Sequence, residues 1–287
     1  DHIKYMMITT VPTISIALIF FIIYNLLNLP IENITTTDYI ESIKDFFLIS
    51  PVLFIVPAIV ILMIVKKINP VISLFVGTIL AALFALIFQS ELISNIINQD
   101  STGELSTYRI IMDAIVSETS IETNTLFLNE LLSSSGMSGM LDTIWLVICA
   151  MIFGGTMEAI GALKTISLSL LKIAKSTINL FASTVLSCIT VNVTASDQYL
   201  SIVIPGKMFS KAFSDRKLSS LNLSRTIEDS GTVTSVLIPW NTCGAYQSSV
   251  LNVSVFDYFV FAIFNWLSPF MTLFIAAINY KIKRLIN

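Results

Sequence analysis

The chain has 287 residues, of which 55% are hydrophobic and 12% are charged, and its formal net charge is −3. A soluble globular domain carries about 25% charged residues, so this composition excludes one and predicts an all-α polytopic membrane protein. His2 is the single histidine, and the three cysteines lack neighbours at metal-ligand spacing. We therefore expect no enzyme activity, no bound cofactor and no nucleic-acid partner.

The first part of the chain, residues 1–88, contains three apolar runs long enough to cross a hydrocarbon core of roughly 30 Å. They predict transmembrane helices over residues 5–27, 46–65 and 71–88. We expect Pro12 to kink the first of them. A polar loop is expected over residues 29–45, and membrane lipid is the expected surrounding of all three helices.

Residues 89–141 form an acidic connection in which apolar residues recur at helical spacing, as at Tyr108, Ile111 and Ile115. This pattern is typical of amphipathic helices at a membrane interface. Carboxylates far outnumber Arg109 here, and basic residues favour the cytoplasmic side of a membrane. We therefore predict an external loop.

The remaining residues, 142–287, are expected to form the ion-binding part of the chain. A fourth span is predicted over residues 142–163, and a last one over residues 257–280. Gly154 and Gly155 permit close helix approach in the fourth span. Glu158 is a candidate buried carboxylate there: it either carries protons or lies near the inner interface.

A polar stretch interrupts the middle of the apolar residues 178–207. Each half is short for a membrane crossing, so we predict a re-entrant hairpin with its tip at residues 191–196; one tilted span is the alternative. A hairpin returns the chain to the side it left, which places all basic residues except Lys44 and Arg109 on the cytoplasmic side, together with both ends of the chain.

A second polar stretch interrupts the helix predicted over residues 222–252. Ser230, Gly231 and Thr232 mark a break, and Pro239 marks a second kink. Paired interruptions near the membrane midplane indicate the binding site of a secondary transporter. The prediction is thus six transmembrane helices, one re-entrant hairpin and one broken helix. The sequence holds one copy of this unit, which favours one half of an inverted-repeat transporter.

The two interruptions offer only oxygen-bearing side chains to a ligand, which suits a hard cation such as sodium. The candidate ion ligands are Asn192, Thr194, Asp197, Asp229, Ser230, Thr232 and Asn241. Burial raises the pKa of a carboxylate and a bound cation lowers it. One carboxylate can thus hold a proton or help to hold sodium. Asp229, Asp197 and Glu158 are the candidate proton carriers, and Asp229, Asp197 and Asn192 the candidate sodium ligands.

Structural alternatives exist for two of these regions. Asp197 is well placed to cap the helix that returns from the hairpin, and capping could be its whole role. Arg225 could form an ion pair with Glu228 at helical spacing near the membrane interface. Of the two adjacent carboxylates, Glu228 and Asp229, only one is expected to face a cavity.

Three stretches resemble the NhaC-type sodium–proton antiporters: DQYLSIVIPG at residues 197–206, LSRTIEDSGTVTS at 223–235 and LIPWNTCGA at 237–245. The resemblance implies a two-repeat fold, of which this chain is similar to the C-terminal half, with the other half as its partner. It also implies sodium–proton exchange by alternating access across a bacterial cell membrane. The family includes exchangers of malate for lactate.

Several functions can be weighed. A sodium- and proton-coupled organic-acid antiporter is the nearest alternative, and we rank it second because Lys207 and Arg225 are expected outside the midplane. An intramembrane hydrolase is disfavoured because Ser201 and Lys207 would lie on different helix faces. A channel or structural subunit remains open, as does a homo-oligomer. We expect no coupled exchange by residues 1–287 alone.

Overall fold

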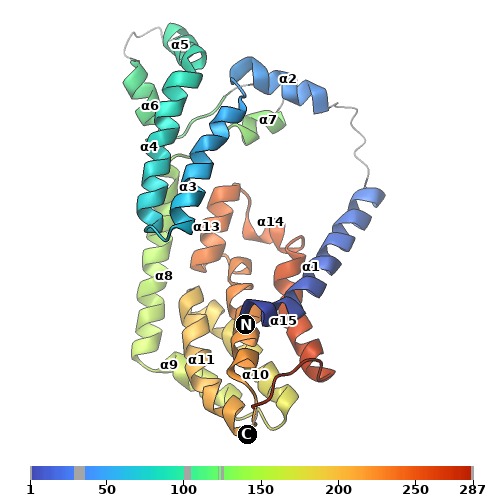
Figure 1. The fold of residues 1–287 in the computed structure, drawn as a ribbon. Coiled ribbons are helices and arrows are strands. Elements are labelled where there is room, and N and C mark those ends of the chain that lie inside the picture. The colour runs from blue at the N-terminus through green and yellow to red at the C-terminus, as the bar shows by residue number, and fades with distance from the viewer. Residues whose placement is uncertain (1, 29–35, 100–104, 122, 124–125, 286–287) are drawn as a thin grey trace. The chain divides into compact units, whose positions relative to one another are not determined.

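The computed structural model describes residues 2–28, 36–99, 105–121, 123 and 126–285, and these residues are almost entirely helical (Figure 1). Among them, β-type pairing is limited to the isolated bridges Thr119–Ser134 and Leu218–Arg284. The chain divides into two compact units. The first comprises residues 1–29 and 142–287, and the second residues 30–141.

The first unit contains the elements that carry the candidate site. Its helices are α1 (His2–Leu27), α8 (Leu141–Ala159), α9 (Ala162–Leu171), α10 (Thr177–Ala195), α11 (Gln198–Asp215), α12 (Ser220–Ile227), α13 (Thr242–Leu251), α14 (Val255–Phe259) and α15 (Ile263–Ala277). Helix α1 packs against α12 and α15, far away in sequence. Leu180, Phe181, Phe209 and Phe213 lie in its main hydrophobic core.

Helices α10 and α11 form the predicted hairpin and pack against each other (Figure 1). The predicted tip was wrong, because residues 191–195 are still helical and the chain turns at Ser196 and Asp197. The hydroxyls of Thr190 and Thr194 donate to carbonyls one turn earlier, so these polar groups are satisfied within the helix.

Neither half of the hairpin is short, contrary to our expectation. Helix α10 has 19 residues and is a candidate membrane span. At 1.5 Å per residue it reaches about 28 Å. Ser196 has a left-handed backbone with φ of 57°, and this residue reverses the chain. One continuous span over residues 178–207 is therefore excluded, while the re-entrant placement stays a prediction.

The predicted break after α12 is confirmed and is longer than expected. Residues Glu228–Thr232 are π-helical, and the Val233 N–H donates to the Glu228 carbonyl at 3.1 Å. A 3-10 turn, Ser235–Leu237, follows before α13 begins at Thr242. We call residues 228–241 the broken segment.

Two predicted spans end differently in the structure. Helix α8 stops at Ala159, because Gly161 adopts a left-handed backbone with φ of 75° and starts α9. Leu163 therefore belongs to the next helix. The last predicted span is divided into α14 and α15, and α15 has 15 residues.

The close helix approach expected at the α8 glycines is confirmed at Gly154, which lies against the end of α10, but not at Gly155. A Cβ atom on Gly154 would lie 2.4 Å from the carbonyl oxygen of Ala195, at the end of α10. A Cβ atom on Gly155 would meet nothing within 4 Å. Only one glycine of the pair thus brings α8 against the hairpin turn.

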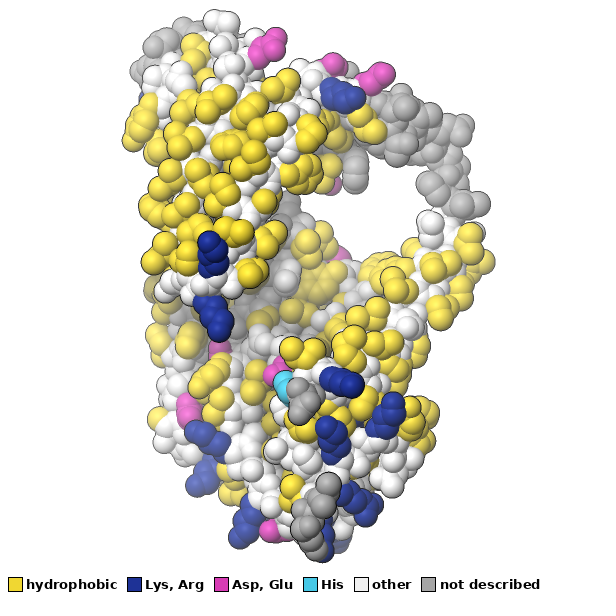
Figure 2. All heavy atoms as spheres, viewed as in Figure 1, with side chains coloured by type: hydrophobic (Ala, Val, Ile, Leu, Met, Phe, Trp, Pro, Cys, Tyr) yellow, Lys and Arg dark blue, Asp and Glu magenta, His cyan; other side chains and the backbone are white. Residues whose placement is uncertain are grey.

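The second unit contains α2 (Thr36–Phe46), α3 (Ile55–Val65), α4 (Pro70–Phe88), α5 (Ser90–Gln99), α6 (Thr107–Val116) and α7 (Leu126–Leu131). Helices α3 and α4 pack together, and Figure 2 shows hydrophobic side chains covering their visible face. The helical spacing predicted within residues 89–141 is confirmed. Its placement at a membrane interface stays a prediction.

The predicted second span and the loop before it differ from the structure. Helix α2 occupies part of the expected loop, of which residues 29–35 lie outside the described residues. The stretches Ile40–Phe46 and Pro51–Val65 are bent by 83°. Ser50 accepts a bond from the Val52 N–H and Pro51 lacks an N–H, so a new helix starts there.

Four helical stretches within the described residues are long and apolar enough to cross a membrane: His2–Leu27, Pro70–Phe88, Ser138–Ala159 and Thr177–Ala195. Counting the bent pair as one span raises this number to five. The chain is thus an all-helical, multi-pass membrane protein, and the count of six stays unconfirmed. Within the first unit, Figure 2 shows Lys and Arg side chains gathered near α9 and the C-terminus.

Candidate functional site

Side chains from three other elements bind the carbonyls of the broken segment. Asn192 of α10 donates to the Gly231 carbonyl at 2.6 Å, and Asn265 of α15 donates to Val233 at 2.8 Å. The Tyr258 hydroxyl of α14 donates to the carbonyl of Val236. Non-helical backbone at membrane depth requires such partners within the protein. These bonds therefore hold the interruption in place.

Asn192 and Asn241, both predicted ligands, lie against each other. The Asn241 amide donates to the Asn192 side-chain oxygen at 3.2 Å, and the Asn192 amide also lies 3.2 Å from the Thr234 hydroxyl. Both Asn side chains are fully buried. The Thr242 N–H donates to the carbonyl of Ser196 at 3.0 Å. The hairpin turn and the broken segment are thus joined by polar contacts.

Asp229 lies in the π-helical turn and is buried, with 3% of its surface exposed. Its carboxylate accepts a hydrogen bond from the Thr272 hydroxyl of α15. The Thr9 hydroxyl of α1 also lies close to it. The carboxylate is thus enclosed by three elements, and the hydroxyl oxygens beside it could also bind a cation.

The other predicted ligands of the broken segment point elsewhere. The Ser230 hydroxyl donates to the carbonyl of Thr226, one turn earlier. The Thr232 hydroxyl donates to the Glu228 carboxylate at 2.6 Å. Glu228 is half-buried, so Asp229 is the more enclosed of the two adjacent carboxylates.

Thr194 and Asp197 have local structural partners. The Thr194 hydroxyl donates to the Thr190 carbonyl at 2.7 Å, and Asp197 accepts a bond from the Leu200 N–H at 2.9 Å. The second contact is the helix cap that the sequence allowed as an alternative. Asp197 and Asp229 therefore have different hydrogen-bond partners, and their joint binding of one ion stays a prediction.

The prediction that Glu158 is buried was wrong. It lies in the last turn of α8, where its side chain is exposed. It lines a surface pocket together with Lys164 and Lys207. A carboxylate beside two ammonium groups at a helix end fits the interface position that the sequence left open. Its role as a proton carrier stays a prediction.

The alternative that Arg225 forms an ion pair with Glu228 was wrong. Arg225 is fully buried, and its guanidinium nitrogens have no hydrogen-bond partner. It therefore forms no ion pair with Glu228. Its guanidinium carbon instead lies 4.6 Å from the centre of the Tyr5 ring.

Sequence reasoning missed several residues of this region, namely Thr9, Tyr258, Asn265 and Thr272. Asn265 and Thr272 are single polar residues in an apolar run, Thr9 is one of two adjacent threonines, and Tyr258 lies among other aromatic residues. Such hydroxyls usually bind their own helix, so their residue type alone did not distinguish them. Helical spacing gives one weak signal, because Thr9 and Thr13 are four residues apart and are both buried.

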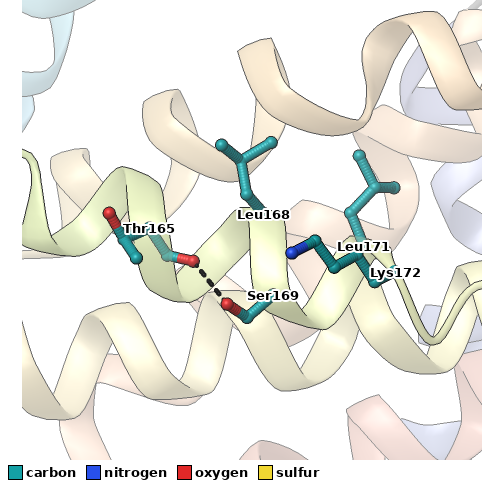
Figure 3. A pocket seen from close by; sticks show the side chains of 5 residues that line it. All are labelled: Thr165, Leu168, Ser169, Leu171 and Lys172. Carbon is teal, nitrogen blue, oxygen red and sulfur yellow. Dashed lines mark hydrogen bonds between the residues drawn. The ribbon is translucent and has the colours of Figure 1, made fainter.

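A second pocket, on α9, does not compete as a site (Figure 3). Its polar hydroxyls are used within the helix: Ser169 donates to the Thr165 carbonyl at 2.9 Å, and Thr165 donates to the carbonyl of Gly161 at 2.9 Å. Lys172 and two leucines complete the lining. The pocket thus lacks the converging buried oxygens found around Asp229.

Apolar helices, an interrupted helix and an enclosed carboxylate together define the class of membrane transporters. The family model described as "Na+/H+ antiporter family" matches residues 1–279. The chain therefore belongs to the Na+/H+ antiporter family.

The names of similar relatives describe two kinds of antiporter. The chain is 30% identical over 283 residues to the Na+/H+ antiporter NhaC of Bacillus subtilis, covering 97% of this chain and 59% of the relative. For NhaC of Alkalihalophilus pseudofirmus the identity is 33% over 276 residues, covering 95% and 56%. The malate-2H+/Na+-lactate antiporter of Bacillus subtilis is 28% identical over 272 residues, covering 93% and 54%.

The chain spans little more than half the length of these curated relatives. No solved structure matches it.

Proposed function

We propose that this chain takes part in exchanging sodium for protons across the membrane by alternating access, with Asp229 as the shared binding group. The observation that carries the proposal is an enclosed carboxylate in a helix interruption, surrounded by hydroxyl oxygens. Membership in the Na+/H+ antiporter family supports the identity of the two ions. A buried intramembrane carboxylate is costly and usually functional.

The hydroxyl of Thr272 suits both states of such a site. It donates to the Asp229 carboxylate in the structure, and a hydroxyl also carries lone pairs that can bind a cation. A sodium ion would bind the carboxylate and rotate the hydroxyl. A proton on the carboxylate would exclude the ion. Exchange follows if the site opens to each side of the membrane in turn.

The π-helical turn is our candidate for the element that moves. π-helical turns are rare and frequently occur at functional sites. Glu228–Thr232 carries Asp229 and adjoins carbonyls held by side chains rather than by the regular helix pattern. A change in these side-chain bonds would reorient Asp229 without unfolding α12.

We also propose that the membrane is the bacterial inner membrane and that both ends of the chain face the cytoplasm. The grouping of Lys and Arg side chains near α9 and the C-terminus supports this orientation, because cytoplasmic loops are enriched in these residues.

Measuring whether sodium and proton fluxes are coupled tests the proposed exchange. In sealed liposomes, the purified chain together with its expected partner half should acidify or alkalinise the lumen when a sodium gradient is imposed, and reversal of the gradient should reverse the pH change. Exchange predicts sodium and proton movements that stop together when either ion is withheld. Sodium movement that continues without proton movement would instead indicate a channel.

An organic-acid antiporter is the second candidate, and the burial of Arg225 favours it. We ranked it lower because Arg225 was expected outside the membrane midplane; the support for it is that protein encloses the Arg225 guanidinium, which leaves room for a charged partner. A guanidinium group matches the geometry of a carboxylate. In the same liposomes, malate or lactate should then be required for sodium movement. Undiminished exchange without any organic acid would rule this candidate out.

A further inference from the structure

A surface pocket lies where α8 ends and α9 begins, in a part of the first unit that the exchange proposed at Asp229 does not use. Its volume is about 350 Å³, within the range of about 300–1,000 Å³ that is typical of small-ligand sites. Helices α9 and α11 pack against each other beside it. The lining residues are Glu158, Gly161, Leu163, Lys164, Val203, Ile204, Lys207 and Met208.

The length of α8 places this pocket near a membrane surface. The candidate span Ser138–Ala159 has 22 residues, and at 1.5 Å per residue it reaches about 33 Å, close to the roughly 30 Å of a hydrocarbon core. The end of this span therefore lies near the level of the lipid phosphates. Gly161, with its φ of 75°, turns the chain into α9 at that end. Glu158 and Lys164 flank this turn.

The lining combines exposed charge with apolar surface. Its charged side chains, all three exposed, are those of Glu158, Lys164 and Lys207. Leu163 is fully buried beneath them, and the aliphatic lining residues of α11 are half-buried. A lysine stem can lie along such apolar surface while its ammonium group stays in water. Positive charge beside apolar surface is the complement of a phosphate group attached to acyl chains.

The charge balance of the pocket narrows the choice of lipid. Two ammonium groups and one carboxylate give the pocket a net charge of +1. Within the part of the chain that the structure describes, none of these three side chains forms an ion pair within 4.0 Å. A headgroup with one negative charge and hydroxyl donors fits best. Its phosphate can bind both ammonium groups, and the carboxylate can accept a hydroxyl hydrogen bond.

We propose that this pocket binds the headgroup of an anionic phospholipid of the phosphatidylglycerol type. Lys164 and Lys207 bind the phosphate, and Glu158 accepts a hydrogen bond from a headgroup hydroxyl. The acyl chains extend along α8 past Met151, which is exposed and lies two turns before Glu158 on the same helix face. Basic pockets between spanning helices bind such headgroups. The bound lipid joins α9 to α11, because each helix supplies one lysine.

Native mass spectrometry tests this site on the purified chain together with its expected partner half, in detergent with added phosphatidylglycerol. Lys164→Gln and Lys207→Gln should each weaken lipid binding roughly fivefold, because each removes one positive charge from the membrane surface. Lys175→Gln is the matched control, since Lys175 is exposed and follows α9 but does not line the pocket. It should change the affinity less than twofold. All three lysines are exposed, so the variants should fold.

Glu158→Gln tests the choice of headgroup. It removes the one like charge and keeps an acceptor, so it should tighten phosphatidylglycerol binding. Phosphatidylethanolamine carries an ammonium group that would pair with Glu158. Preferred binding of that lipid, weakened by Glu158→Gln, would overturn the proposal.

Two further comparisons separate a lipid site from its alternatives. Glycerol phosphate has the anion without acyl chains and should not displace the lipid; displacement would mean that the pocket binds a free phosphate. Equal losses in Lys164→Gln and Lys175→Gln would indicate diffuse attraction to the membrane surface and no site. If the assembled transporter retains no phosphatidylglycerol, the proposal is wrong as well.

Discussion

At the scale of single residues, the enclosed carboxylate of Asp229 depends on hydroxyls from helices far away in the sequence. Thr272 of α15 donates to it, and Thr9 of α1 lies beside it. Hydroxyl neighbours let a carboxylate remain charged, or share a cation, in a place that water does not reach. The role proposed for Asp229 therefore needs Thr272 as well.

Replacing Thr272 should weaken sodium binding. Thr272→Val keeps the shape and removes the hydroxyl, so sodium loses an oxygen ligand and the affinity should fall roughly tenfold, as expected for a bond to a charged group. Thr190→Val is the matched control, because the Thr190 hydroxyl binds only the carbonyl of Leu186. Binding isotherms of the two variants check this. Equal affinities in both would remove Thr272 from the site.

Residue type was enough to select some of these positions and not others. Asn192 and Asn241 stand out as amides in apolar sequence, and the structure places them in contact. Thr272 and Thr9 could not be selected, because their importance comes from contacts with Asp229, which lies 43 positions from Thr272 and 220 positions from Thr9. Spacing alone suggested an ion pair between Arg225 and Glu228, whereas the Arg225 guanidinium lies against the Tyr5 ring.

At the scale of elements, the close approach of α8 to the hairpin turn is what keeps the turn beside the broken segment. Gly154 lies against the carbonyl of Ala195, and the adjacent Ser196 carbonyl accepts the Thr242 N–H. A side chain on Gly154 would push these parts of the first unit apart. A side chain is therefore expected to be tolerated at position 155 of α8 but not at position 154.

The glycine pair gives a matched stability test. Gly154→Ala places a Cβ atom 2.4 Å from a backbone oxygen and should destabilise the protein by about 1–3 kcal/mol. Gly155→Ala meets open space and gains helix propensity, so it should be neutral or stabilising by up to about 1 kcal/mol. Thermal unfolding in detergent measures both. The same loss of Tm in the two variants would contradict the packing we describe.

The sequence predicted which elements are interrupted better than where they end. The hairpin and the break at Ser230, Gly231 and Thr232 were found, because small and polar residues are rare in spanning helices. The tip was misplaced because the hydroxyls of Thr190 and Thr194 are satisfied within α10, and the chain reverses only at Ser196. Gly161 ended α8 early through a left-handed backbone, which the apolar pattern did not reveal.

At the scale of the whole molecule, the placement of positive charge should set the orientation in the membrane. The hairpin returns the chain to the side it left, and α11 leads directly to Lys211, Arg216 and Lys217. Cytoplasmic loops collect such residues. We therefore expect residues 207–217 to face the cytoplasm.

Cysteine labelling in oriented membrane vesicles tests this orientation. Ser214 is exposed, so a cysteine introduced there, with the native cysteines replaced, should react with an impermeant reagent only from the cytoplasmic side. Asn95→Cys in the acidic connection serves as the reference and should react only from outside. Labelling of Ser214→Cys from outside would contradict both the return of the chain to the cytoplasmic side after the hairpin and the charge argument.

Length and apolar periodicity were sufficient to predict an all-helical membrane protein, because a spanning helix needs about 20 apolar residues. They were not sufficient for the number of spans. Pro51 starts a new helix within one predicted span, and α14 and α15 divide another. Tertiary contacts decide such boundaries, and local sequence does not contain them.

The central claim is that sodium displaces a proton from Asp229, and proton release on sodium binding measures it directly. In weakly buffered solution near neutral pH, saturating sodium should release protons from the wild-type protein, and lower pH should weaken sodium binding because protons compete for the carboxylate. Asp229→Asn keeps the shape and an oxygen ligand but cannot titrate, so sodium should release no proton from folded Asp229→Asn protein. Wild-type proton release from that variant would contradict the account.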